Sequence, residues 1–181
     1  MNLQFDFEKK LGKIKPMHAV NNGPKKPSRM YTRSGNFEYY RDACIPYARN
    51  HDAAFCANYG GEHSVDISAI FPNFDADPYN EESYDFACTD EAILSCLDAG
   101  TETYFRLGET IEHQIKKHAV NPHLDFAKWA RICEHVIRHY NEGWADGFEW
   151  NITYWEIWNE PDLDANREIK KTWSGTVEQF F

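Results

Sequence analysis

The apolar and polar residues along the chain follow two spacings, and these spacings alternate. Alternate apolar positions or a short apolar run predict a strand, and apolar positions three or four residues apart predict a helix. The strand pattern occurs in residues 14–20, 45–51, 101–107 and 152–158. The helix pattern occurs in residues 37–44, 83–99 and 126–140. Gly100 and Gly143 lie just beyond two of these helices, where glycine commonly ends a helix.

Strands that alternate with helices of this length predict βαβ units and therefore a parallel sheet. Polar side chains recur at every second position of the strands, as at Tyr47 and Arg49, and again at Tyr154 and Glu156. An open sheet with helices on both faces has strands that are apolar throughout. A polar face instead favours the inside of a (β/α)₈ barrel, where Arg49 or Arg106 would neutralise Glu156.

The chain has 181 residues, whereas a complete barrel of this kind needs about 250. Near the end of the sequence, Thr176 and Gln179 have the spacing of a capping box, which predicts a helix that begins there. The predicted fold class is therefore α/β, a partial (β/α)₈ TIM barrel made of about the first four βα units. A half barrel would expose sheet edges, which favours pairing with a second copy or with a missing C-terminal half.

Composition excludes several classes of partner. The net charge of −10 argues against nucleic acid and anionic membranes. The sequence has no run of about eighteen apolar residues for a membrane span, and its first residues lack the apolar segment of a secretory signal. The five cysteines are scattered without a CxxC pair, which favours reduced, mostly buried thiols and a cytoplasmic location.

The stretch YWEIWNEPD, residues 154–162, contains the strongest candidate for chemistry. In a parallel barrel the functional groups lie at the carboxyl ends of the strands, and Asn159 and Glu160 directly follow the fourth predicted strand. A carboxyl group beside Trp158 and Pro161 is in surroundings that suit a general acid. Glycoside hydrolysis uses two carboxyl groups, one of them as that acid. Alternatively, Glu160 only caps a helix that starts after Pro161.

Further blocks narrow this interpretation. They read KPMHAVNNGP, IPYARNHDA, VDISAIFPNFDADP, YDFACTDE, LDAGTETYFRLGETIEH and YWEIWNEPD, in this order. Together they resemble the N-terminal half of glycoside hydrolase family 39, the β-xylosidase and α-L-iduronidase family, from about Gly12 to Phe181. The resemblance implies a retaining (β/α)₈ glycosidase of clan A. Residues 1–181 would then be the N-terminal half of its catalytic domain, truncated at the start of the fourth helix.

The resemblance also implies roles for individual residues. Glu160 matches the general acid/base, Asn159 matches the residue that binds the substrate's 2-hydroxyl group, and Arg49 matches an arginine near the nucleophile. The other candidates for substrate binding are His18, His51, Asp52, Glu112, His113 and Trp158. The nucleophile of such enzymes is a glutamate near the end of the seventh strand, and no residue of this sequence matches it. No metal or organic cofactor is implied, and the expected substrate is a xyloside-like oligosaccharide or glycoside.

Some residues have alternative interpretations. Trp158 and Phe71 are candidate platforms for a sugar ring. His51 with Asp52 could instead form a metal pair, and the acidic loop DADP, residues 75–78, could bind calcium. His135 and His139 lie four residues apart in the second long predicted helix, a spacing that would allow both to bind zinc. A solvated helix face is nevertheless expected there.

A second function of a different class stays open. A half barrel without the nucleophile would be catalytically inactive and would act as a sugar-binding or self-assembling module. Such a module would bind xylose oligomers without turnover as a homo-oligomer, and these properties would separate it from an enzyme.

Overall fold

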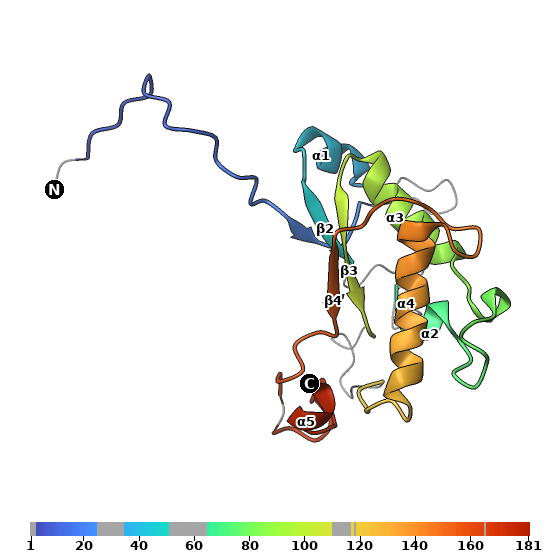
Figure 1. Ribbon diagram of the computed structural model, residues 1–181. Coiled ribbons are helices and arrows are strands. Elements are labelled where there is room, and N and C mark those ends of the chain that lie inside the picture. The colour runs from blue at the N-terminus through green and yellow to red at the C-terminus, as the bar shows by residue number, and fades with distance from the viewer. Residues whose placement is uncertain (1–2, 25–34, 51–64, 110–116, 118, 165) are drawn as a thin grey trace.

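The centre of the molecule is a parallel four-stranded sheet, seen in a computed structural model that describes residues 3–24, 35–50, 65–109, 117, 119–164 and 166–181 (Figure 1). Its strands are β1 (Val20–Asn21), β2 (Tyr47–Asn50), β3 (Glu102–Leu107) and β4 (Tyr154–Ile157). They lie in the order β1-β2-β3-β4, so each strand is beside the next strand in sequence. Successive βα units of a barrel give this order, whereas a doubly wound sheet reverses its order at one point. The α/β class and the parallel sheet are confirmed, and the sheet is consistent with part of a barrel.

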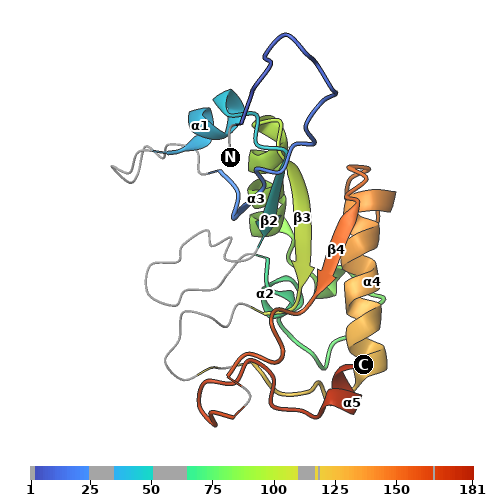
Figure 2. The ribbon, with the colours of Figure 1, turned by 90° about the vertical axis from the view of Figure 1, so that its left-hand side faces the viewer.

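Helices cover one face of this sheet. The α-helices of the described residues are α1 (Phe37–Asp42), α2 (Ile67–Ile70), α3 (Ala87–Asp98), α4 (Phe126–Glu142) and α5 (Val177–Phe180), and the face is covered by α3 and α4 (Figures 1 and 2). Figures 1 and 2 both show α3 and α4 packed on the same side of β2, β3 and β4. Phe105 and Leu107 of β3 join Ile132, Val136 and Tyr140 of α4 in one buried cluster. The amphipathic pattern of α4 therefore forms the core between the helices and the sheet.

The opposite face of the sheet has the polar pattern expected for a barrel interior. The register places Tyr104 beside both Arg49 and Tyr154, and it places Arg106 beside Glu156. The rings of Tyr104 and Tyr154 stack with their centroids 5.5 Å apart. Polar groups of neighbouring strands thus lie side by side on the face away from α3 and α4.

The helix boundaries agree closely with the sequence, since α1 and α4 begin at the predicted residues 37 and 126. Gly100 and Gly143 have φ angles of 74° and 71°, which glycine adopts without a steric penalty, and they follow α3 and α4 closely. The predicted capping box before α5 is present, with reciprocal hydrogen bonds between Thr176 and Gln179. However, α3 starts at Ala87 rather than at residue 83, because Glu81–Ser83 forms a separate 3₁₀ turn.

The first strand is much shorter than predicted. Residues 14–19 are exposed and only Val20 and Asn21 pair with β2, opposite Ala48 and Arg49. Pro16 has no N–H group for a ladder, so it interrupts the strand pattern that the apolar residues suggested. β2 and β4 are also shorter than expected, by about two residues or fewer at each described end.

The histidines expected on a solvated helix face are buried instead, which corrects that prediction. His135 and His139 are each 2% exposed. The His139 ring stacks on Phe86 with centroids 3.6 Å apart, and its two nitrogens lie 3.2 Å from Asp90 Oδ1 and 2.9 Å from the Trp144 carbonyl oxygen. Burial is tolerated because these hydrogen bonds replace water.

Candidate active site

Arg49 and Asn159 meet at the carboxyl ends of β2 and β4. The Arg49 guanidinium donates from Nη2 to Asn159 Oδ1 at 2.6 Å. It also donates to both carboxylate oxygens of Glu156, from Nε at 2.5 Å and from Nη2 at 2.8 Å. One arginine therefore ties β2 to β4 across the intervening β3. The ion pair expected for Glu156 is confirmed, with Arg49 as its partner.

The backbone that carries Asn159 and Glu160 is unusual. Trp158 and Glu160 have φ angles of 65° and 40°, a region that residues with a Cβ rarely adopt. Such residues cost on the order of 1 kcal/mol each and persist only where surrounding contacts hold them. As a result, Asn159 is turned inward, at 4% exposure, while Glu160 is exposed.

Hydrogen bonds hold this turn on both sides. The Trp158 N–H donates to the Leu107 carbonyl oxygen at 2.7 Å, which ties the turn to the end of β3. The Glu160 carbonyl oxygen accepts from the Leu163 N–H at 3.0 Å and from the Thr172 hydroxyl group. Among the described residues, none forms a hydrogen bond or ion pair with the Glu160 carboxyl group. The carboxyl group thus projects from a fixed backbone.

Trp158 forms part of the base beneath this turn. Its side chain is 3% exposed, and its indole N–H donates to the Thr172 carbonyl oxygen at 2.9 Å. The ring meets Trp173 edge-on with centroids 5.3 Å apart. Phe71, the other proposed sugar platform, is also buried, in the core between sheet and helices. Stacking of a sugar on either ring stays a prediction, and the arrangement described here packs both rings against protein.

A second polar cluster lies at the end of β3, and it joins residues that are far apart in the sequence. The Ser68 N–H and hydroxyl group donate to the two carboxylate oxygens of Glu109, at 3.1 Å and 2.5 Å. Next to this contact, Arg106 Nη2 donates to Asp66 Oδ1 at 2.9 Å. Burial and the negative charge of Asp66 together raise the pKa of the Glu109 carboxyl group to about 7, although Ser68 and Arg106 oppose the shift.

The remaining candidates for substrate binding are His18, His51, Asp52, Glu112 and His113. His51, Asp52, Glu112 and His113 lie outside the described residues. His18 lies before the short β1, and its Nε2 donates to the Cys44 carbonyl oxygen at 3.0 Å. Because Cys44 precedes β2, this places His18 toward the amino ends of the strands, not at the carboxyl ends where the sequence analysis expected it. Its role in substrate binding stays a prediction.

Other sequence-based alternatives can be located in the structure. In the acidic loop considered for calcium, Asp77 Oδ1 accepts from the Tyr79 N–H at 2.9 Å, and Asn73 Oδ1 accepts from the Asp75 N–H at 3.1 Å. These are contacts that turn residues commonly make. Within the described ranges, no three His, Cys, Asp or Glu side chains are grouped to hold a metal ion. Of the cysteines described, Cys44 and Cys88 are exposed, whereas Cys96 and Cys133 are buried.

None of the helices in the described part of the chain is both long and apolar enough to cross a bilayer.

The fold is similar to that of a solved glucosidase. The crystal structure of a glucosidase from Croceicoccus marinus matches this chain with a TM-score of 0.72 and 26% sequence identity. The match covers 95% of this chain and 33% of the glucosidase, so the chain spans about one third of that protein's length. No family model and no curated protein matches the sequence. The chain therefore has a glycosidase-like fold, and it resembles a glycoside hydrolase distantly.

Proposed function

We propose that this chain is part of the catalytic domain of a retaining, β-xylosidase-like glycoside hydrolase with Glu160 as the general acid/base. One observation carries the proposal. Arg49 holds the Asn159 amide at the carboxyl end of the sheet, while the next residue, Glu160, extends its carboxyl group outward. An amide and a carboxyl group adjacent at a strand end suit a sugar hydroxyl and a glycosidic oxygen. The glucosidase similarity supports the same reaction class.

The chemistry would proceed in two steps. Glu160 first protonates the leaving oxygen while a carboxylate nucleophile attacks the anomeric carbon, which forms a glycosyl-enzyme intermediate. Glu160 then takes a proton from water, and that water releases the sugar. Arg49 donates a hydrogen bond to the Asn159 amide oxygen and so fixes the orientation of the amide beside the acid. We assign the nucleophile to no residue of this sequence, since Glu156 is held by Arg49.

The substrate class rests on the sequence resemblance. The resemblance to family 39 favours a β-xyloside as the substrate, whereas the similar solved structure is a glucosidase. Xylosides and glucosides are both pyranosides and differ at C5. The test therefore compares 4-nitrophenyl β-xyloside with the matching β-glucoside. Faster cleavage of the glucoside would reject the xylosidase assignment and keep the glycosidase proposal.

Replacement of the acid tests the mechanism. In the complete enzyme, Glu160→Ala should slow hydrolysis of xylobiose, which needs a protonated leaving group, at least about a hundredfold more than hydrolysis of an activated aryl xyloside. Azide should restore turnover of the activated substrate, because it attacks the intermediate without a general base. Asp162→Asn is the matched control, since Asp162 is exposed two residues away. Equal losses on both substrates without azide rescue would contradict the assignment of Glu160.

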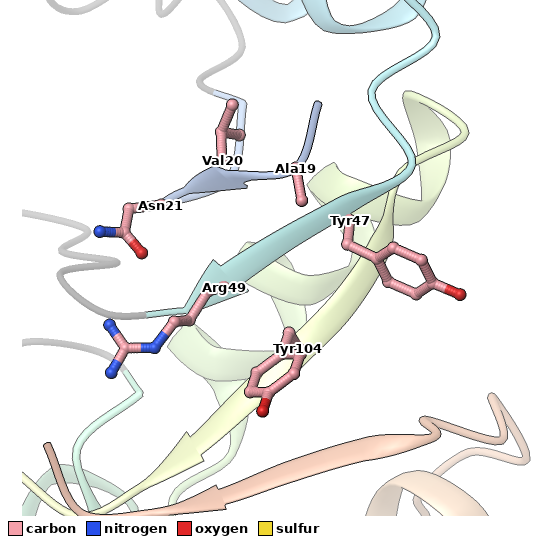
Figure 3. A pocket seen from close by; sticks show the side chains of 6 residues that line it. All are labelled: Ala19, Val20, Asn21, Tyr47, Arg49 and Tyr104. Atoms are coloured by element: carbon pink, nitrogen blue, oxygen red, sulfur yellow. The ribbon is translucent and has the colours of Figure 1, made fainter. Parts of the chain in front are cut away.

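One feature favours a second candidate function, a sugar-binding module without turnover. A pocket of about 390 Å³ opens on the polar face of the sheet, lined by Ala19, Val20, Asn21, Tyr47, Arg49 and Tyr104. Figure 3 shows Arg49 and Tyr104 bordering it from neighbouring strands. Xylose oligomers that bind in calorimetry but are not cleaved in the assay above would favour this module over the enzyme.

A further inference from the structure

Thr172 lies 12 residues beyond Glu160 and contacts the turn around Asn159. It lies in the segment between β4 and α5 and is fully buried, at 0% exposure. Its hydroxyl group donates to the Glu160 carbonyl oxygen, and its own carbonyl oxygen accepts the Trp158 indole N–H at 2.9 Å. Its N–H donates to the Leu163 carbonyl oxygen at 3.3 Å. One residue thus binds both neighbours of Asn159.

These two neighbours, Trp158 and Glu160, both have positive φ angles. A backbone in that region relaxes unless its surroundings hold it. The Trp158 side chain and the Glu160 carbonyl group are both held by Thr172, on the two sides of the inward-turned Asn159. The contacts of Thr172 therefore favour the conformation in which the Asn159 side chain is buried and the Glu160 side chain is exposed.

The segment that carries Thr172 is itself anchored, and its anchor is independent of the sheet. The Ser174 N–H donates to the Val120 carbonyl oxygen at 2.8 Å, and the Lys117 N–H donates to the Ile169 carbonyl oxygen at 2.9 Å. Gly175 lies so close to Pro122 that an added Cβ would be 2.6 Å from its ring. Thr172 therefore connects the turn after β4 to the segment before α4.

We propose that Thr172 is a positioning residue for the candidate acid/base, a role that rests on the function proposed for Glu160. Its hydroxyl group holds the Glu160 backbone so that the carboxyl group points outward and Asn159 stays within reach of Arg49. The Thr172 methyl group only fills space in the buried site. A hydroxyl group at this position is required, and serine can replace threonine.

Two variants separate the hydroxyl group from the methyl group. Thr172→Val removes the hydroxyl group at nearly constant shape, and Thr172→Ser removes only the methyl group. Thr176→Val is the matched control, because it removes a threonine hydroxyl four residues away that caps α5. The first readout is hydrogen exchange of the Trp158 indole N–H, measured by NMR in the intact chain. Thr172→Val should speed this exchange about tenfold or more, and the other two variants should change it little.

The second readout is turnover. Thr172→Val should lower kcat for xylobiose by about tenfold to a hundredfold while KM changes little, and activated aryl xylosides should be affected less. Thr172→Ser should keep most of the activity. Equal losses in the valine and serine variants, or an indole exchange rate that does not change, would overturn the positioning role. These rates are measured in the complete enzyme. A complete enzyme that cleaves no glycoside would refute the proposed function, while the exchange experiment would still test the hydrogen bonds of Thr172.

Folding is monitored by circular dichroism. If Thr172→Val does not fold, Thr172→Ala removes the hydroxyl group without placing a methyl group against the Glu160 carbonyl oxygen. If neither variant folds while Thr172→Ser does, Thr172 is required for folding and the positioning role is rejected.

Discussion

At the scale of single residues, the burial of an ionisable side chain is the property that is hardest to predict from the sequence. Glu109 follows the glycine at the end of a predicted strand and looks like an ordinary loop residue. Its environment depends on Asp66 and Ser68, about forty positions away, and on the buried thiol of Cys133. Asn159 and Glu160 were identified because they are adjacent in one motif, whereas the Glu109 cluster exists only after residues from α2, β3 and α4 meet.

The raised pKa of Glu109 predicts a specific pH dependence of stability. In the folded chain Glu109 keeps its proton up to about pH 7, whereas the unfolded chain loses it above its ordinary pKa of 4.5. Between these values the folded state binds more protons, so the free energy of unfolding falls as pH rises, by up to about 3 kcal/mol in total. Glu109→Gln should remove this slope and be at least as stable as the wild type at pH 8.

Urea unfolding at pH 5, 6, 7 and 8, followed by tryptophan fluorescence, measures the slope. Glu149→Gln is the control, because Glu149 is exposed and should leave the pH dependence as it is. The groups that face Glu109 are Asp66, Ser68, Arg106 and Cys133, and all stay in place in the glutamine variant. An identical slope in the wild type and in Glu109→Gln would assign the pH dependence to other groups.

At the scale of helices and strands, local patterns predicted what local contacts determine. The ends of α3 and α4 follow from Gly100 and Gly143, which supply the left-handed backbone, and the capping box before α5 needs only four residues. The length of β1 depends on how far β2 lies alongside, so an apolar run could not define it. The burial of His139 depends on the packing of α4 against α3, which its own helix pattern does not reveal.

That packing contains a polar contact whose loss should destabilise the protein. Asp90 of α3 accepts from the Tyr140 hydroxyl group at 2.9 Å and lies 3.2 Å from His139 Nε2 on α4. Asp90→Ala would leave two buried polar groups without this partner, which costs about 2–4 kcal/mol. Thermal and urea unfolding measure the loss, and Glu91→Ala, at an exposed position of α3, is the control. Similar losses in both variants would mean that the contact between the helices contributes little.

At the scale of the whole molecule, the two faces of the sheet differ in whether helices cover them. Helices α3 and α4 pack on one face of the sheet (Figure 2). The polar face opposite them carries Tyr47, Tyr104 and Tyr154. The expectation of a partial barrel came from this polar alternation and from the order of the elements, both of which the sequence contains. Closure of a barrel depends on strands beyond β4, so neither pattern could establish it.

The outer edge of β4 should make the chain self-associate. β4 pairs with β3 on one side, and among the described residues no strand pairs with its other edge. Ile157 on this strand is 64% exposed and Tyr154 is 45% exposed. An unpaired edge with apolar side chains favours pairing with another copy, and a lysine there opposes it. Sedimentation velocity should therefore show a concentration-dependent dimer that Ile157→Lys weakens at least about tenfold.

The control for this prediction is Leu94→Lys on α3. Leu94 is 45% exposed, so the substitution adds the same charge to an apolar surface position on the helical side of the sheet. If both lysine variants weaken the dimer equally, the β4 edge is not its specific interface. General charge repulsion would not explain such a loss, because an added lysine reduces the net charge of −10 and so lowers the repulsion between copies. A chain that sediments as a monomer at all concentrations would contradict pairing through β4, and the edge would then be protected by its short length of four residues.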